Sequence, residues 1–448
     1  MNIAIIGVGS IGYQLAKRFT LFEGDIVIIE QNPERAEYAR EHLDAMVIEG
    51  NATDYETLKS AQIDKMDAFV ALTRSDEVNL LSCKIAKKMG VQATVARIKN
   101  LQYLKSNFIV PKEEFGVDLL IHPEQETAKA IVRLINLATS TDSIEFENGK
   151  VHFTGLRLDT NAEILRTPLA ELGVKYKHIP MRIVAIKRNL RTIIPRGSDF
   201  LMKGDQIFFT CDPNYFDELL EIFGKKNVKI EDVMIIGGGQ IAYFIAENLQ
   251  HKLNIKIIEK DEVKATAIAN QLKNTLVIHG DGSDLDLLTL EGMPDMDEFI
   301  AITGDDETNI ITSIIAKHLK VPRAITLINK NEYLPLSSTL GLDAVVSKQQ
   351  ITVNVIESFI KRQTIANVVE LPGIDAEITM YIAKEKSKIL DKPLKNIDFP
   401  RGAIVGAVIN QKDQLIIPTG DTKINSGDKV LILSTTEQIK NVEKLFKS

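Results

Sequence analysis

Short apolar runs alternate with amphipathic stretches over residues 1–125. The runs are rich in β-branched residues, which is typical of strands buried on both faces of a parallel sheet. The stretches between them have helical spacing, and Asn32-Pro33 and Asp76-Glu77 are suitable helix starts. The alternation favours an α/β fold with a Rossmann-like, doubly wound parallel sheet. Its strands are predicted at Ile3–Ile6, Asp25–Glu30, Ala45–Glu49, Ala68–Leu72, Ala93–Ile98 and Val117–Ile121.

The pattern changes after residue 123. Apolar residues first follow a helical stripe, at Ala128, Ile131, Leu134, Ile135 and Ala138. Short strands then predict a small α+β unit, at Ser143–Glu147, Val151–Leu158, Met181–Arg188, Leu190–Pro195 and Gln206–Cys211. Short helices fit at Thr167–Leu172 and Pro213–Phe223.

The whole pattern occurs twice. The glycine turn at Gly7 recurs 230 residues later at Gly237, and a second helical stripe covers Ile351–Ile360. Matching pairs of segments keep the register: Gly50-Asn51 with Gly280-Asp281, Asp76-Glu77-Val78-Asn79 with Asp306-Glu307-Thr308-Asn309, Pro168-Leu169 with Pro393-Leu394, Pro195-Arg196-Gly197 with Pro418-Thr419-Gly420, and Gly204-Asp205 with Gly427-Asp428. The chain is therefore predicted to be a tandem duplication with large and small domains in alternation.

Six segments follow from this pattern. They are a Rossmann-like domain at 1–125, a linking helix at 126–140, a small α+β domain at 141–229, a second Rossmann-like domain at 230–347, a linking helix at 348–367 and a second small domain at 368–448.

The first glycine turn has the spacing of a dinucleotide-binding loop. Gly7 permits a tight turn, Gly9 allows a diphosphate to approach the backbone, and Gly12 lets the next helix pack closely on the sheet. Glu30 ends the second strand, where a carboxylate can accept hydrogen bonds from a ribose diol. Glu259 holds the same place in the second half. A carboxylate there disfavours a 2′-phosphate, so the motif indicates NAD(H) or an adenosine nucleotide such as ATP or ADP rather than NADP.

Composition narrows the class of protein. The net charge of −7 argues against a nucleic-acid backbone as the main partner. The two cysteines, Cys83 and Cys211, have no metal-ligand spacing and are expected in the core of a protein of the reducing cytosol. Met1 leads directly into the first strand, which leaves no room for a signal peptide. No apolar run reaches the ~18–20 residues of a membrane span, so we expect membrane contact only through a partner.

The small domains contain no concentrated cluster of catalytic residue types. A dehydrogenase needs a substrate domain that places a proton donor beside the nicotinamide, so an NAD-dependent oxidoreductase is the less favoured reading. His122 has Glu124 and Glu126 nearby but no further nitrogen or sulfur ligand at useful spacing, and no metal site is predicted. Two nucleotide folds without a catalytic partner are better suited to a sensor that is not an enzyme.

The two halves resemble the paired RCK (or KTN) regulatory domains of potassium channels and transporters, and the chain is similar over its length to the TrkA family of Trk potassium-uptake regulatory subunits. The resemblance depends on the duplicated glycine turns, the two Asp-Glu-x-Asn segments and Phe399–Val408. It implies a cytosolic subunit that binds a nucleotide and gates a TrkH-like or TrkG-like membrane subunit. It also implies rings of eight regulatory domains, hence four copies of this chain. Regulation of potassium efflux, or sensing of a cyclic dinucleotide, stays open as an alternative.

The candidate binding residues are grouped at the carboxyl ends of the predicted strands. In the family that the chain resembles, the segment that corresponds to Asn51 and Asp281 lies beside the adenine, and Asp or Asn there can bond its exocyclic amine; a helix cap or turn is the alternative role for these two residues. Arg74 would meet a phosphate or solvent. Arg97 resembles the family's phosphate-facing arginine, with a nucleotide or subunit contact expected. Asp76, Asn79, Asp306 and Asn309 are interpreted as helix caps. The complete set is Gly7, Val8, Gly9, Ser10, Ile11, Gly12, Glu30, Asn51, Ala52, Thr73, Arg74 and Arg97, with Gly237, Gly238, Gly239, Gln240, Ile241, Ala242, Glu259, Asp281, Gly282 and Thr303.

The two sites are predicted to be unequal. The second half has Ala242 in place of Gly12 and Leu327 in place of Arg97. Alanine fits many helix–sheet contacts, but loss of a charged phosphate contact weakens binding by roughly tenfold or more. We therefore expect the first site to bind NAD(H) better.

Overall fold

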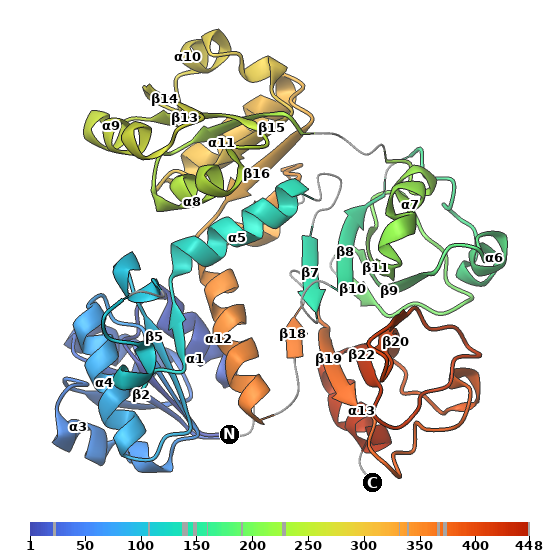
Figure 1. The fold of residues 1–448 in the computed structure, drawn as a ribbon, viewed down its shortest axis with the longest axis horizontal. Coiled ribbons are helices and arrows are strands. Elements are labelled where there is room, and N and C mark those ends of the chain that lie inside the picture. Colours follow the sequence, from blue (N-terminus) through green and yellow to red (C-terminus); the bar gives the residue numbers. More distant parts are fainter. Residues whose placement is uncertain are drawn as a thin grey trace. The chain divides into compact units, whose positions relative to one another are not determined.

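The computed structural model describes residues 1–20, 24–105, 108–136, 142–146, 150–158, 160–189, 191–225, 230–330, 332–337, 340–364, 368–370 and 374–446. The chain divides into two compact units, residues 1–131 with 233–363 and residues 132–232 with 364–448 (Figure 1). The first unit contains two parallel sheets, and the second contains two antiparallel sheets.

The first parallel sheet has the strand order β3-β2-β1-β4-β5-β6. Its order reverses between β1 and β4, and such a switch point creates a crevice at the carboxyl ends of the strands. The strands are β1 (Ile3–Ile6), β2 (Ile26–Glu30), β3 (Met46–Glu49), β4 (Ala68–Ala71), β5 (Ala93–Arg97) and β6 (Leu119–Ile121). The helices between them are α1 (Ser10–Phe19), α2 (Pro33–His42), α3 (Tyr55–Ser60) and α4 (Asp76–Lys88).

The second parallel sheet repeats this topology, in the order β14-β13-β12-β15-β16-β17. Its strands are β12 (Asp232–Ile236), β13 (Asn254–Glu259), β14 (Thr275–His279), β15 (Glu298–Ala301), β16 (Arg323–Leu327) and β17 (Ala344–Val346). Its helices are α8 (Gln240–Leu249), α9 (Glu262–Gln271), α10 (Leu285–Leu290) and α11 (Asp306–His318). The duplication read from the sequence is thus present in the fold.

A helix of the second half completes the core of the first domain. Helix α12 (Lys348–Thr364) buries Val353, Ile356 and Ile360 in the same apolar cluster as β1, β2, β4 and β5 (Figure 1). Arg18 of α1 forms an ion pair with Glu357 of α12, with 2.9 Å between Nε and Oε2. The stripe predicted at Ile351–Ile360 therefore packs within the chain.

The preceding linking helix, α5 (Pro123–Asn136), also has a buried stripe. Its members Ala128, Ile131, Leu134 and Ile135 are buried, whereas Ala138 lies outside the described residues. At its start, the His122 ring lies edge-on to the ring of Phe244 in α8, with 5.6 Å between ring centroids. Both linking helices thus bury apolar faces in the folded chain.

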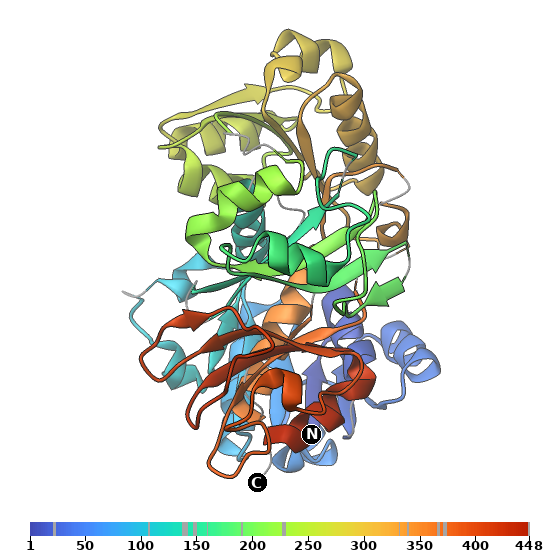
Figure 2. The same ribbon diagram turned by 90° about the vertical axis from the view of Figure 1, so that its right-hand side faces the viewer.

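The second unit consists of two small sheets that share a core (Figures 1 and 2). The first has the order β10-β9-β11-β8-β7 and the second β18-β19-β22-β20-β21. Phe153 and Phe208 of one sheet share an apolar cluster with Ile378, Leu431 and Leu433 of the other. The strands are β7 (Asp142–Phe146), β8 (Val151–Arg157), β9 (Met181–Arg188), β10 (Arg191–Ile193), β11 (Gln206–Cys211), β18 (Val368–Glu370), β19 (Glu377–Ile382), β20 (Ala403–Ile409), β21 (Leu415–Ile416) and β22 (Lys429–Ser434). The helices are α6 (Leu169–Lys175), α7 (Phe216–Ile222) and α13 (Ile439–Phe446).

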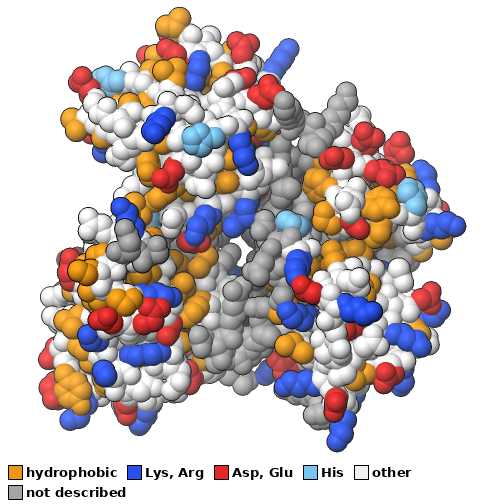
Figure 3. Space-filling model, viewed as in Figure 1, with side chains coloured by type: hydrophobic (Ala, Val, Ile, Leu, Met, Phe, Trp, Pro, Cys, Tyr) orange, Lys and Arg blue, Asp and Glu red, His pale blue; other side chains and the backbone are white. Residues whose placement is uncertain are grey.

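The predicted strands are confirmed, most of them to within one or two residues. The small-domain helices are less regular than expected. The predicted helix at Pro213–Phe223 begins as a 3₁₀ turn at Pro213–Tyr215, and the second-half counterpart of α6 is only a 3₁₀ turn at Leu394–Asn396. Among the described residues, no helix is both long and apolar enough to cross a membrane. On the face drawn in Figure 3, charged side chains of both signs are interspersed with apolar ones.

Candidate nucleotide-binding sites

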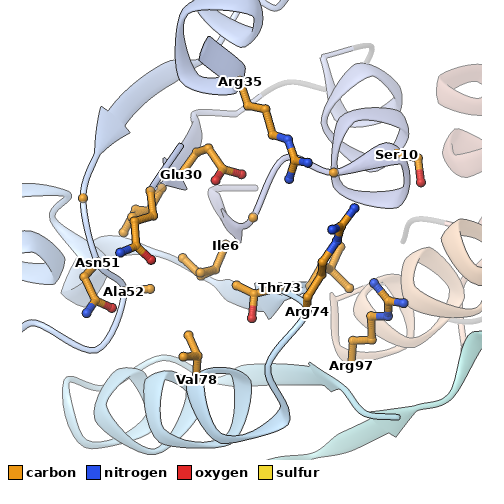
Figure 4. A pocket seen from close by; sticks show the side chains of 16 residues that line it. Ile6, Ser10, Glu30, Arg35, Asn51, Ala52, Thr73, Arg74, Val78 and Arg97 are labelled. Atoms are coloured by element: carbon orange, nitrogen blue, oxygen red, sulfur yellow. The ribbon is translucent and has the colours of Figure 1, made fainter. Parts of the chain in front are cut away.

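A cavity of about 470 Å³ lies at the carboxyl edge of the first parallel sheet, where the strand order reverses. Its walls come from the ends of β1, β2 and β5, from the loops that follow β1 to β4, and from the first turns of α1, α2 and α4. Figure 4 shows Asn51 and Ala52 at one end, Arg97 at the other, and Glu30 between them. The lining residues are Ile6, Gly7, Gly9, Ser10, Ile29, Glu30, Gln31, Arg35, Gly50, Asn51, Ala52, Leu72, Thr73, Arg74, Val78 and Arg97.

The glycine turn leaves a free approach to the start of α1. Gly7 has φ +85°, a left-handed conformation that other residues rarely adopt. A side chain at Gly9 would meet nothing within 4 Å, so a ligand has room to reach the backbone there. A Cβ at Gly12 would lie 2.1 Å from the Gly7 carbonyl oxygen, which explains why glycine is needed for this close packing. Helix α1 has no side-chain cap, and its first residue, Ser10, lines the cavity, so the N–H groups of its first turn suit an anion.

The carboxylate of Glu30 is fixed by the backbone on both sides. Its Oε2 accepts a hydrogen bond from the Val8 N–H at 2.7 Å, and its Oε1 accepts one from the Asn32 N–H at 2.9 Å. Each oxygen keeps a further lone pair for a ligand hydroxyl. The buried side chain is therefore held beside the glycine turn, as a ribose-binding carboxylate would have to be.

Three arginines from separate elements line the same cavity. Arg35 comes from the first turn of α2, Arg74 from the loop after β4, and Arg97 from the end of β5. None of their guanidinium groups forms an ion pair with a carboxylate in the described part of the chain, and the buried Nε of Arg97 has no acceptor there. With Glu30 as the only acidic lining residue, the described cavity has an excess of positive charge that suits phosphate groups.

Asn79 of α4 forms hydrogen bonds with the ends of both β4 and β5, next to this cavity. Its Oδ1 accepts hydrogen bonds from the Thr73 backbone N–H at 2.9 Å and from the Thr73 hydroxyl at 2.7 Å. Its Nδ2 donates to the Thr73 and Arg97 carbonyl oxygens at 3.2 and 2.8 Å. The completely buried amide thus positions two lining residues.

The interpretation of Asp76 and Asn79 as helix caps is wrong. Ser75 caps α4 and accepts a hydrogen bond from the Val78 N–H. Asp76 instead accepts hydrogen bonds from the backbone N–H groups of Lys99 and Asn100, at 2.9 and 2.8 Å. A carboxylate inside the first turn is directed back toward the β5 loop, so it fixes that loop and not the helix start.

The second half repeats this framework. Asn309 connects Thr303 to the Leu327 carbonyl oxygen, and Asp306 accepts from the Asn329 and Lys330 N–H groups. Asp305, not Asp306 or Asn309, caps α11. The repeated Asp-Glu-x-Asn segment is therefore a structural connection between neighbouring strand ends in both domains.

A second cavity of about 470 Å³ lies at the corresponding edge of the second parallel sheet. Glu259 repeats the role of Glu30, since it accepts hydrogen bonds from the Gly238 and Asp261 N–H groups at 2.6 and 2.8 Å. Gly237 has φ +96°, and Gly239 again faces open space. The lining residues are Gly237, Gly239, Ile258, Glu259, Lys260, Lys264, Asp281, Gly282, Ser283, Ile302, Thr303, Gly304, Asp305 and Thr308.

The charges around the second cavity differ from those around the first. Gly304 and Leu327 stand where the first half has Arg74 and Arg97, and the cavity is lined by three carboxylates against two lysines. The cations, Lys260 and Lys264, come from the end of β13 and from α9. The second cavity therefore lacks the positive charge that surrounds the first.

Most predicted site residues line a cavity. In the first half Val8, Ile11 and Gly12 do not, and in the second half Gly238, Gln240, Ile241 and Ala242 do not. These residues build the turn and its helix. Arg35, Lys260 and Lys264 line the cavities but were absent from the predicted set. A basic residue five positions after each acidic strand end, Arg35 and Lys264, is the signal in the sequence that could have identified two of them.

Asn51 and Asp281 form turns, as one of the two readings expected, and they line the cavities as well.

His122 is buried, and desolvation lowers its pKa, so the ring is neutral near pH 7. Its ring nitrogens face the Lys99 carbonyl oxygen and the Gln125 N–H. Within the described residues, no group of three or more histidine, cysteine or acidic side chains could hold a metal ion.

The chain is similar to known proteins over its full length. The TrkA-N domain family matches residues 3–123 and 233–348, and the TrkA-C domain family matches residues 153–224 and 378–447. Trk system potassium uptake protein TrkA of Azorhizobium caulinodans is 31% identical over 453 residues, which cover 100% of this chain and 99% of that protein. TrkA homolog 1 of Methanosarcina mazei is 34% identical over 456 residues, with 100% of both chains covered.

Solved structures agree on the fold. The GsuK RCK domain is similar with a TM-score of 0.62 at 17% identity, covering 99% of this chain and 94% of that one. The GsuK channel bound to NAD is similar with a TM-score of 0.63 at 17% identity, covering 99% of this chain and 78% of that one. At this identity the likeness establishes the RCK fold only.

Proposed function

Because the chain belongs to the TrkA family of Trk-system potassium uptake proteins, we propose that it is the nucleotide-sensing regulatory subunit of a potassium uptake system. It binds NAD(H), ATP or ADP in its parallel-sheet domains and gates a TrkH-like or TrkG-like membrane subunit. The observation that carries the proposal is the first cavity, where an open glycine turn, a fixed ribose-binding carboxylate and three arginines without ion-pair partners in the described chain converge.

Regulation by binding needs no catalysis. A ligand that binds one conformation better than another shifts the equilibrium between them by its difference in affinity. The first cavity offers the glycine turn and three arginines to a diphosphate and the Glu30 carboxylate to a ribose. These groups are suited to binding an adenine nucleotide. The NAD-bound form of the GsuK channel supports NAD(H) as a ligand class for this fold.

The unequal charge of the cavities supports an unequal pair of sites. The first domain is proposed to bind NAD(H) more tightly, because Arg35, Arg74 and Arg97 surround its phosphate region. The second keeps Glu259 and the glycine turn, so it retains weaker affinity for adenosine nucleotides.

The proposal extends to organisation in the cell. The domain boundaries are proposed at 1–125, 126–140, 141–229, 230–347, 348–367 and 368–448. Four copies are proposed to form a ring of eight regulatory domains, which the transporter subunit recruits from the cytoplasm to the cytoplasmic face of the cell membrane.

Titration calorimetry with NADH on three proteins tests the function: the wild type, Gly9→Asp and Gly239→Asp. Both glycines have ordinary φ values, −65° and −79°, and open space around them, so the variants should fold. In the wild type, the titration should show a tight phase of NADH binding from the first site and a weaker phase from the second. Gly9→Asp should remove the tight phase because its carboxylate repels the diphosphate, and Gly239→Asp should remove only the weaker phase. Potassium uptake should then fail in cells whose regulatory subunit carries Gly9→Asp. Equal losses in the two variants, or normal nucleotide-dependent uptake with Gly9→Asp, would contradict the proposal.

A further inference from the structure

The two cavities present opposite hydrogen-bonding groups at the same point of the repeated fold. Asn51 Oδ1 accepts hydrogen bonds from the Thr53 N–H at 3.0 Å and from the Thr53 hydroxyl at 2.9 Å. Asp281 Oδ1 accepts the same pair from Ser283, at 2.9 and 2.7 Å. The same turn therefore occupies one terminal oxygen in each side chain and leaves the second terminal atom for another partner.

That second atom is a donor in one cavity and an acceptor in the other. Asn51 Nδ2 carries two N–H donors and has no partner among the described residues. Asp281 Oδ2 accepts a hydrogen bond from Lys260 Nζ at 2.7 Å and keeps one free lone pair. Hydrogen bonds from Lys260 and Ser283 hold the pKa of Asp281 well below its usual range, so this oxygen is an acceptor at any physiological pH.

The base of a bound nucleotide would lie at this end of each cavity. A diphosphate at the open glycine turn places the adjoining ribose at Glu30. The base attached to that ribose then lies beyond Glu30, where Figure 4 shows Asn51 and Ala52, and away from Arg97. Asp281 and Gly282 line the matching end of the second cavity.

We propose that the two sites distinguish the substituent at position 6 of a purine in opposite ways. The second site selects a 6-amino purine, because Asp281 accepts a hydrogen bond from the amine and repels a carbonyl oxygen. The first site binds a 6-oxo purine at least as well, because Asn51 donates to that oxygen. This inference rests on the proposed function, since it requires a purine nucleotide in both cavities.

Lys260 is a second group in the second cavity that can form a hydrogen bond with the base. Its Nζ is a donor beside Asp281 and could itself serve a 6-oxo group. The ion pair with Asp281 directs this donor to the carboxylate, so the proposal assigns recognition of the base to the free lone pair of Asp281. Replacing Lys260 by glutamine separates the two roles.

The test is calorimetric titration with ADP and IDP, which carry the same diphosphate and differ at position 6 of the base. The Gly9→Asp protein reports the second site, and it should bind ADP about three- to tenfold more tightly than IDP. The Gly239→Asp protein reports the first site, and it should bind IDP at least as tightly as ADP.

Exchanging the two side chains should exchange the preferences. Adding Asp281→Asn to Gly9→Asp should abolish the preference for ADP, and adding Asn51→Asp to Gly239→Asp should create one. Equal affinities in both single variants would overturn the inference while leaving the proposed function intact. If the preference for ADP over IDP survives Asp281→Asn but is lost with Lys260→Gln, Lys260 and not Asp281 recognises the base. If the wild-type protein binds NADH but neither ADP nor IDP, this inference is overturned and the proposed function stands. If it binds none of the three, the proposed function falls, and this inference falls with it.

Discussion

The side-chain amide of Asn79 donates a hydrogen bond to the backbone carbonyl oxygen of Arg97, with 2.8 Å between Nδ2 and the oxygen. The bond joins the start of α4 to the end of β5. Because Asn79 also holds Thr73, one buried side chain fixes two of the strand ends that form the first cavity. Binding geometry in this domain therefore depends on a residue that does not line the cavity.

Asn79→Asp should weaken both the domain and its site. The carboxylate keeps the bonds from Thr73 but cannot donate to the Arg97 carbonyl oxygen, and it is completely buried. We expect a loss of about 2–3 kcal/mol in the free energy of unfolding, measured by denaturant titration. The tight NADH phase should weaken by about tenfold in calorimetry. Asn309→Asp is the matched control, and it should leave the tight phase unchanged.

Arg97→Leu and Leu327→Arg test the charge difference between the sites. Arg97 is one of three arginines around the first cavity, and its loss removes a charge-assisted phosphate contact. The tight NADH affinity should fall by roughly tenfold or more. The reverse change, Leu327→Arg, should strengthen the weaker phase. Calorimetry that shows no change in the tight phase for Arg97→Leu would remove this arginine from the site.

The Arg18–Glu357 pair should contribute measurably to the stability of the first domain. The side chains are only 17% and 4% exposed, so solvent screens the pair little. Glu357→Gln should lower the free energy of unfolding by about 2–4 kcal/mol. Hydrogen exchange should locate the faster opening in β1, β2 and β4. A double-mutant cycle with Arg18→Met should give a coupling of at least about 1 kcal/mol. A coupling near zero would mean that the Arg18–Glu357 pair does not help to hold α12.

Glu298 should make stability depend on pH. Burial raises the pKa of this carboxyl to about 7 despite Arg323 nearby, with Oε2 3.5 Å from Nη1. The folded chain then keeps a proton that the unfolded chain releases above its ordinary pKa of 4.5. This group's contribution to stability therefore falls as pH rises from about 4.5 to about 7, by on the order of 3 kcal/mol.

Thermal unfolding at pH 5 and pH 8 checks the Glu298 prediction. Glu298→Gln does not titrate, so the variant should lose less stability than the wild type between the two pH values. Glu262→Gln, an exposed substitution in the same domain, should behave like the wild type. The same pH dependence in all three proteins would show that Glu298 is ionised in the fold.

Features set by neighbouring residues could be predicted from the sequence. The strand at Ile3–Ile6 was predicted with its observed ends, because a β-branched run followed by a glycine turn is a local signal. The approach of Glu30 to the same turn followed from strand and motif spacing. The duplication supports the same register, since each pattern occurs twice.

Features set by the tertiary fold could not be predicted in this way. The position of Arg35 in the cavity depends on the angle at which α2 leaves the sheet, which no local pattern encodes. Asp76 has the residue type and the place of a helix cap, but the neighbouring Ser75 takes that role, and Asp76 binds a loop 23 residues later. The helical stripe of α12 indicates a packing face, whereas its partner sheet lies more than 220 residues earlier in the chain.

The position of α12 has a consequence for synthesis on the ribosome. All strands of the first parallel sheet have been made once residue 121 is added, but the helix that covers one face of that sheet ends its described core contacts at Ile360. At 5–20 residues per second, the apolar face stays uncovered by α12 for roughly 10–50 seconds. The nascent first domain is thus a natural client for chaperones, and a gene fragment ending near residue 230 should yield an aggregation-prone product.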